Sequence, residues 1–167
     1  MNLNLPNSLT LLRIILIPII VFLFISNSES NRFFVFILFL IASITDYLDG
    51  LIARYMKQQT NFGEFLDPVA DKLLVIITMI LLISENQNIL FLIPILIIIT
   101  REFLVIAIRQ RLAEMGENVK LSVLLISKIK TALQLISLLL LLYKFPILGY
   151  NTYWVGTILL QISALLT

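Results

Sequence analysis

The chain has 167 residues, of which 60% are hydrophobic and 13% are charged. A soluble domain is roughly half apolar and about a quarter charged, so this composition predicts an integral membrane protein. The chain contains no cysteine and no histidine, which excludes disulfides, thiol nucleophiles and the commonest zinc ligands. Its formal net charge of +2 is too small to predict nucleic-acid binding. Any chemistry must therefore use carboxylates, amines or hydroxyls.

Six apolar segments approach the roughly 20 residues that a helix needs to span a bilayer. In chain order they cover residues 6–25, 33–55, 64–84, 89–111, 120–143 and 153–166. The polar stretches between them predict a loop at 26–32, a turn at 57–63, a hairpin at 85–88, a second turn at 115–118 and a connection at 144–150. The first segment contains Arg13 and is followed by no small-residue cleavage site, so we expect it to be retained. The sequence thus predicts an all-α integral membrane protein with six transmembrane helices in a single domain, residues 1–167.

The basic residues predict the orientation of these helices. With a cytoplasmic N-terminus, the inner turns carry five basic residues and the outer turns two. The inner ones are Arg54, Lys57, Arg109, Arg111 and Lys120, and the outer ones are Arg32 and Lys144. Because basic residues concentrate in cytoplasmic loops, we expect the N-terminus to be cytoplasmic. The stretch 46–71 and the inner ends of the fourth and fifth segments then lie at the cytoplasmic face.

All four aspartates of the chain lie between residues 46 and 71. Asp46 and Asp49 are three residues apart and Asp67 and Asp71 are four apart, so each pair shares one face of its helix. The short turn at 57–63 makes the two helices antiparallel neighbours. The four carboxylates can therefore form one cluster.

Such a cluster needs compensation, because an ionisable residue at the centre of a membrane helix costs roughly 2.5 to 3.5 kcal/mol on insertion scales. Oxygen ligands without histidine or cysteine suit hard cations, Mg²⁺ or Mn²⁺, and two such ions would neutralise four carboxylates. The alternative is a structural ion network with Arg54, Lys57 and Lys72. Gly50 and Ala53 share the aspartate face and allow a ligand or another helix to approach closely. Arg54 would either reach the interface or hold a phosphate.

The spacing of these residues resembles the signature of the CDP-alcohol phosphatidyltransferase family. The matching pattern is Asp46-x2-Asp49-Gly50-x2-Ala53-Arg54-x8-Gly63-x3-Asp67-x3-Asp71. Eight fixed positions at fixed spacings make the resemblance specific, and it extends over nearly the whole chain. It implies six transmembrane helices, a homodimer, and transfer of a phosphatidyl group from a CDP-lipid to an alcohol with release of CMP.

The resemblance also implies roles for individual residues. The four aspartates would hold two divalent cations, Mg²⁺ or Mn²⁺, on the CDP diphosphate, and Asp71 would also be the general base. Gly50, Ala53 and Arg54 would border the nucleotide, and Gly63 would let the next helix start close by. Arg13, inside the first segment, would approach the phosphates of the lipid nucleotide, or alternatively extend to the interface.

Two further stretches place cations inside apolar segments: Thr-Arg-Glu-Phe at 100–103 and Ser-Lys-Ile-Lys-Thr at 127–131. Arg101 and Lys130 lie about ten residues, or roughly 15 Å, from the inner edge, and we expect them to converge beside the aspartates. Such a cation pocket suits an acceptor that carries its own phosphate, which favours glycerol 3-phosphate over serine, choline or ethanolamine. Alternatively, Arg101 pairs with Glu102 or with an aspartate. Lys128 and Lys130 are about 200° apart on a helix, so only one of them faces the site.

These stretches and the opening residues 5–13 are similar to the bacterial branch of the family that makes phosphatidylglycerol phosphate from CDP-diacylglycerol. That branch implies a bacterial cytoplasmic membrane, with the active site facing the cytoplasm. Ser127 stands where the branch often has glycine, and relatives that transfer to inositol phosphate can have serine there. Glycerol 3-phosphate and another alcohol such as inositol phosphate therefore both remain open. A small cation transporter is the rival from another class, although the carboxylates gather toward one face only.

Overall fold

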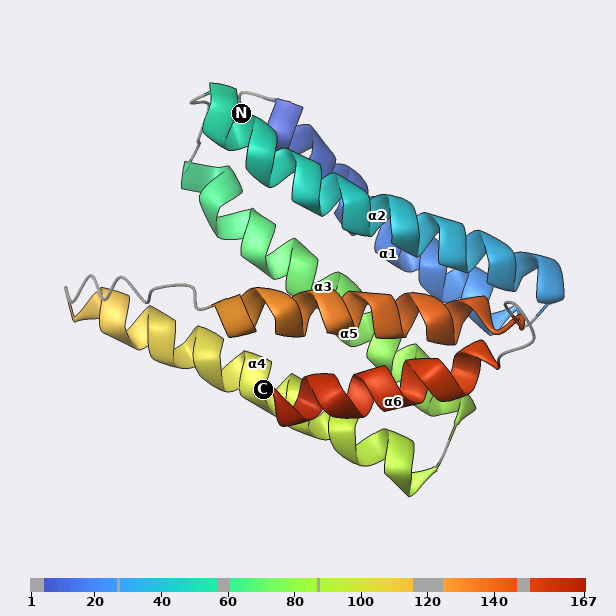
Figure 1. Ribbon diagram of the computed structural model, residues 1–167. Coiled ribbons are helices and arrows are strands. Elements are labelled where there is room, and N and C mark those ends of the chain that lie inside the picture. Colours follow the sequence, from blue (N-terminus) through green and yellow to red (C-terminus); the bar gives the residue numbers. More distant parts are fainter. Residues whose placement is uncertain (1–4, 27, 57–60, 87, 116–124, 147–150) are drawn as a thin grey trace. The chain divides into compact units, whose positions relative to one another are not determined.

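The computed structural model describes residues 5–26, 28–56, 61–86, 88–115, 125–146 and 151–167; side chains at 46–56, 61–68, 71, 125–128 and a few other helical positions lie outside that description. Within these ranges the chain is all-helical (Figure 1). The helices are α1 (Leu5–Ile25), α2 (Glu29–Met56), α3 (Asn61–Glu85), α4 (Ile89–Glu114), α5 (Leu125–Tyr143) and α6 (Thr152–Leu165). The prediction of six helices is confirmed, and each matches one of the six apolar segments.

The chain forms two compact units, Met1–Leu82 and Ile83–Thr167. In the first unit α1 packs along α2. The buried side chains of α1 recur every three or four residues, at Ile17, Ile20 and Phe24, and those of α2 do the same, at Val35, Phe39 and Ala42. This spacing gives each helix one buried face.

The loop predicted at 26–32 is shorter than expected, because α2 already begins at Glu29. The hydroxyl of Ser28 accepts a hydrogen bond from the Asn31 backbone amide at 3.2 Å, and the Ser28 carbonyl accepts one from the Arg32 amide at 3.1 Å. Ser28 therefore caps the helix and extends it through polar residues that resemble a loop in sequence. Arg32 lies on this first turn, with its guanidinium carbon 4.6 Å from the centroid of the Phe24 ring.

In the second unit α5 packs along α6, and α6 also packs against α4. The Ser137 hydroxyl of α5 donates a 2.8 Å hydrogen bond to the carbonyl of Gly156 in α6. Phe91 of α4 stacks on Tyr153 of α6, with ring centroids 6.2 Å apart. Leu138, Leu141 and Leu160 are fully buried and form part of the apolar core.

Side-chain caps fix the ends of the second unit's helices. The Asn88 side chain accepts from the Leu90 amide at 3.1 Å where α4 begins, and Asn151 accepts from the Tyr153 amide at 3.0 Å where α6 begins. The hairpin predicted at 85–88 is confirmed, because α3 ends at Glu85 and α4 starts at Ile89. An ion pair joins Lys144 to Glu85. The turn predicted at 57–63 ends earlier than expected, because α3 begins at Asn61.

The apolar character of the sequence persists on the surface of these helices. The stretch Ile89–Ile108 spans 20 residues at a mean hydropathy of 2.6 and is long and apolar enough to cross a membrane. Shorter apolar helical stretches cover Thr10–Ile25, Ser30–Thr45, Ile129–Tyr143 and Thr152–Leu165. Large apolar side chains such as Phe22, Phe103 and Trp154 are exposed. Exposed apolar surface on this scale suits contact with lipid. The number of membrane crossings and their orientation remain predictions.

At Gly156 of α6 the two helices α5 and α6 approach each other closely. A Cβ added there would lie 2.8 Å from Leu141 Cγ and 3.2 Å from the Ser137 carbonyl oxygen, so Gly156→Ala must push the helices apart. We expect a loss of about 1 to 3 kcal/mol of stability, as for other overpacked cores. Thermal unfolding of purified protein in detergent, followed by circular dichroism, measures this. Ile158→Ala, at an exposed position of the same helix, is the control. An equal melting temperature for the two variants would contradict the close packing.

Candidate active site

The structure places the aspartates on two consecutive helices of the first unit. Asp46 and Asp49 lie in α2, and Asp67 and Asp71 lie in α3. Both stretches are helical, which confirms the premise that each pair shares a helix face. The side chains of the four aspartates lie outside the described residues. The same holds for Gly50, Ala53, Arg54 and Gly63. The carboxylate cluster and its metal ions therefore remain a prediction. Among the described side chains, no group of three or more acidic, histidine or cysteine residues forms a candidate metal site.

Arg13 lies in α1 of the same unit and is completely buried. Thr10, three residues earlier and on the same face of α1, is buried as well. Because a guanidinium keeps its charge in proteins, a buried arginine requires acceptors or negative charge around it. This burial does not fit the alternative in which the Arg13 side chain extends to the interface.

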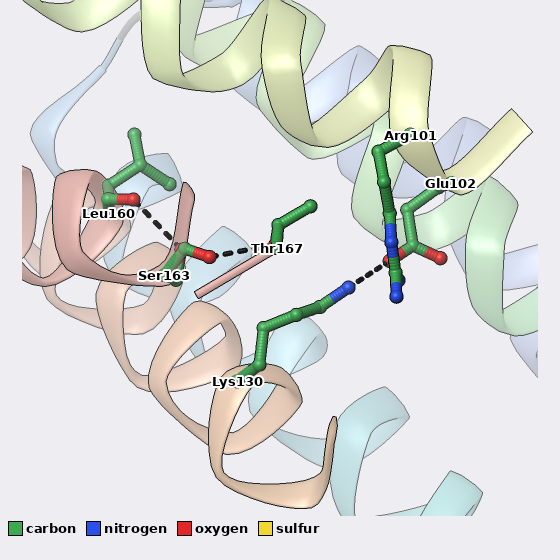
Figure 2. Close-up of polar contacts among 6 residues, drawn as sticks. All are labelled: Arg101, Glu102, Lys130, Leu160, Ser163 and Thr167. Atoms are coloured by element: carbon green, nitrogen blue, oxygen red, sulfur yellow. Dashed lines mark hydrogen bonds and ion pairs between the residues drawn. The ribbon is translucent and has the colours of Figure 1, made fainter. Parts of the chain in front are cut away.

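The second unit contains a cluster of three charged residues, Arg101 and Glu102 of α4 and Lys130 of α5 (Figure 2). The Lys130 ammonium donates to Glu102 Oε1 at 2.6 Å, and Arg101 Nη1 donates to the same oxygen at 3.2 Å. The side chains of Lys130 and Glu102 are only 2% and 6% exposed, whereas that of Arg101 is 35% exposed. One buried carboxylate oxygen thus binds two cations.

Among the described side chains, the cluster brings two cations to one carboxylate. Hydrogen bonds between charged groups are about twice as strong as those between neutral groups, and low exposure strengthens them further. A guanidinium has five donors and an ammonium has three, so both cations can bind more than one acceptor at once. Donors of this kind are the ones that bind carboxylates and phosphates in proteins.

The predicted convergence of Arg101 with Lys130 is confirmed within the second unit, and so is the alternative in which Arg101 pairs with Glu102. Whether the pair lies beside the aspartates stays a prediction. The sequence analysis missed Glu102 as the partner of Lys130. The sequence contained information that pointed to this partner. The α5 segment has no acidic residue, and Glu102 is the only acidic residue inside the apolar part of the α4 segment. Ser127 and Lys128 lie in α5, and their side chains are outside the described part of the structure.

Comparison with known proteins bears on what these two groups of residues do. The model of the CDP-alcohol phosphatidyltransferase family matches residues 3–167. The chain belongs to the CDP-alcohol phosphatidyltransferase family. It is therefore an enzyme, a phosphatidyltransferase, as the aspartate signature predicted.

This phosphatidyltransferase is similar over its full length to bacterial relatives that are called CDP-diacylglycerol–glycerol-3-phosphate 3-phosphatidyltransferase. The relative from Wigglesworthia glossinidia brevipalpis is 41% identical, with 99% of this chain and 93% of the relative covered. The relative from Haemophilus influenzae is 42% identical, with 100% and 89% covered. The relative from Escherichia coli is 38% identical, with 100% and 90% covered.

Proposed function

We propose that this phosphatidyltransferase transfers the phosphatidyl group of CDP-diacylglycerol to glycerol 3-phosphate and releases CMP and phosphatidylglycerol phosphate. The relatives with full-length similarity carry that activity in their names. The observation that carries the acceptor assignment is the contact in which Arg101 and Lys130 meet at one oxygen of Glu102. A phosphate on the acceptor gives such a cluster a group to bind, whereas serine, choline and ethanolamine carry none.

The enzyme would be a multi-pass protein of the bacterial cytoplasmic membrane with its active site on the cytoplasmic side. Six helices, exposed apolar side chains on both units and the stretch Ile89–Ile108 support the membrane location. The excess of basic residues in the inner turns supports the orientation. As in the rest of the family, we expect a homodimer.

The four aspartates, Asp46, Asp49, Asp67 and Asp71, would hold two divalent cations, Mg²⁺ or Mn²⁺. The donor set fits these ions, because all of its ligands are carboxylate oxygens from consecutive helices. When bound, the ions neutralise charge on the diphosphate and make CMP a better leaving group. Further residues would contact the CDP-lipid, namely Gly50, Ala53, Arg54, Gly63 and the buried Arg13.

The acceptor hydroxyl would attack the phosphorus of the phosphatidyl group. A new phosphorus–oxygen bond forms to the acceptor, the bond to the CMP oxygen breaks, and the hydroxyl proton passes to the Asp71 carboxylate. Arg101 and Lys130, with Ser127 on the same helix as Lys130, would bind the acceptor's phosphate and orient its hydroxyl.

A second acceptor class is favoured by one observation. Ser127 replaces the glycine that is common in the glycerol 3-phosphate branch, and inositol-phosphate-transferring relatives can have serine there. Inositol phosphate also carries a phosphate, so the cationic cluster would serve it equally. Cation transport, the rival from another class, is opposed by membership of an enzyme family.

The first experiment measures CMP release by purified enzyme supplied with CDP-diacylglycerol, Mg²⁺ or Mn²⁺ and a series of acceptor alcohols. We expect glycerol 3-phosphate to give the highest kcat/KM. A chelator should abolish release, and excess divalent cation should restore it, because the aspartates cannot replace the charge that the ions supply. Absence of CMP with every acceptor, or full activity in the chelator, would refute the proposal.

The second experiment replaces Asp71 by asparagine, which keeps the shape of the side chain and removes its charge. Loss of a general base costs typically 10²- to 10⁴-fold, so we expect kcat to fall by at least about a hundredfold. Glu85→Gln makes the same change in chemistry at the far end of α3, where Glu85 pairs with Lys144, and should leave kcat near the wild-type value. Both variants should keep wild-type helix content. Unchanged turnover in Asp71→Asn would remove its role as base.

The third experiment tests the acceptor pocket with Arg101→Ala. Loss of one charge-assisted hydrogen bond is worth about 1.5 to 3 kcal/mol, so the KM for glycerol 3-phosphate should rise about tenfold or more. The KM for CDP-diacylglycerol should change little. Arg111→Ala, an exposed arginine in the last turn of the same helix, is the matched control. If only the KM for the CDP-lipid rises, the pocket has been assigned to the wrong substrate.

A further inference from the structure

Aromatic side chains gather at one end of the second unit, where α5 ends and where α4 and α6 begin (Figure 1). Phe91 of α4 stacks on Tyr153 of α6. Tyr143, the last residue of α5, meets Phe145 edge-on, with ring centroids 5.5 Å apart. Trp154, the only tryptophan of the chain, follows Tyr153 directly in α6. These rings thus lie at or beside the ends of three helices.

Polar groups accompany the rings at this end of the unit. An ion pair joins Lys144 to Glu85, and the side chains of the two residues are 41% and 25% exposed. The Thr152 hydroxyl donates a 3.0 Å hydrogen bond to a backbone carbonyl, and Asn88 and Asn151 cap α4 and α6. Backbone groups at helix ends have no partner within the helix, so they need such side chains or water. This end of the unit therefore suits a position beside water.

The exposed surface becomes apolar immediately beyond the rings. Trp154 is 67% exposed, and the exposed residues Ile158, Ile162 and Leu165 follow it at intervals of three or four residues. This spacing places all four side chains on one face of α6. Trp154 therefore lies at the boundary between the polar end of the unit and an apolar helix face. Its indole matches that boundary, because an apolar ring system carries a single N–H donor.

We propose that Trp154, with Tyr143, Phe145 and Tyr153, forms a membrane-interface belt that lies in the headgroup layer of the bilayer and fixes the depth of the second unit. The partner of this surface is the layer where lipid headgroups meet the acyl chains. That layer offers hydrogen-bond acceptors beside hydrocarbon, and tryptophan and tyrosine concentrate there for this reason. The inference goes beyond the proposed function and rests only on the membrane location proposed with it.

The belt predicts the depth at which the cations of α4 and α5 meet. Arg101 is 12 residues after Ile89, where α4 begins, and Lys130 is 13 residues before Tyr143, where α5 ends. At about 1.5 Å per residue, both helices place the contact roughly 18 to 20 Å from the belt. The hydrocarbon core of a bilayer is about 30 Å thick, so the contact would lie nearer the opposite face. Under the proposed orientation, that face is the cytoplasmic one.

The depth of Trp154 can be measured without a label, because the chain has no other tryptophan. The full-length enzyme is reconstituted in phosphatidylcholine vesicles whose acyl chains carry bromine at a chosen carbon. Bromine quenches the fluorescence of a tryptophan that it contacts. We expect quenching to be strongest with bromine at the ester end of the chain and weakest with bromine at the terminal methyl end.

A matched variant moves the indole along the same helix face. Trp154→Phe combined with Ile158→Trp places the only tryptophan four residues further along α6, at another exposed position. Four residues correspond to about 6 Å along the helix axis, so the depth of strongest quenching should shift by about 6 Å toward the bilayer centre. Circular dichroism checks that the variant keeps its helix content. If it does not, the wild-type measurement decides alone.

Several results would overturn the belt. Strongest quenching of wild-type enzyme by bromine at the chain ends would place Trp154 near the bilayer centre. Absence of quenching by every brominated lipid would place it in water if aqueous iodide quenches it, or beneath a second copy of the chain if iodide does not. A folded variant whose quenching depth equals that of wild type would show that this face of α6 does not enter the bilayer.

The fluorescence result is independent of catalysis, so it is distinguishable from the test of the proposed function. An enzyme that releases CMP with glycerol 3-phosphate but has Trp154 near the bilayer centre loses only the belt. A protein with Trp154 at headgroup depth that releases no CMP with any acceptor keeps the belt and refutes only the proposed function.

Discussion

The cost of burying charge among apolar helices is the constraint on which this enzyme's sites depend. In a chain that is 60% hydrophobic, a cation or carboxylate inside the helices is stable only when an opposite charge or a set of hydrogen bonds compensates it. The second unit shows this rule directly, because Lys130 and Arg101 meet on one oxygen of Glu102. Applied to the four aspartates of the first unit, the same rule calls for positive charge, which divalent cations would supply.

The two groups of residues have opposite signs, and this difference suits a reaction between two anionic substrates. A diphosphate and a phosphate repel each other, so an enzyme that joins them must neutralise each one separately. Carboxylates do this for the diphosphate only through bound cations, whereas a cationic cluster binds a phosphate directly. In the proposed mechanism, the acidic helices would serve the donor and the basic side chains the acceptor, without histidine or cysteine.

Much of the fold follows from the sequence, because apolar length determines where helices can form. All six helices were predicted, and within the described residues the largest difference in their bounds is the start of α2, where the Ser28 cap makes a polar stretch helical. The pairing of each aspartate couple on one face also follows from spacing. The bond between Glu102 and Lys130 does not, since 28 residues separate them and only tertiary packing brings α4 and α5 together. Residue spacing predicts which side chains share a face of one helix, but it does not predict which residues on different helices contact each other.

The register of α5 shows which of its two lysines belongs to the cluster. Lys128 and Lys130 are about 200° apart on the helix, and Lys130 occupies the buried face, so Lys130 is the lysine of the cluster. Position 127 is three residues before Lys130 on α5. Under the proposed function, glycerol 3-phosphate and inositol phosphate would each offer a phosphate to Arg101 and Lys130, so charge alone would not separate them. In the proposed mechanism, discrimination would come from a position other than the two cations, and our candidate is residue 127, where this chain has serine and the glycerol 3-phosphate branch often has glycine.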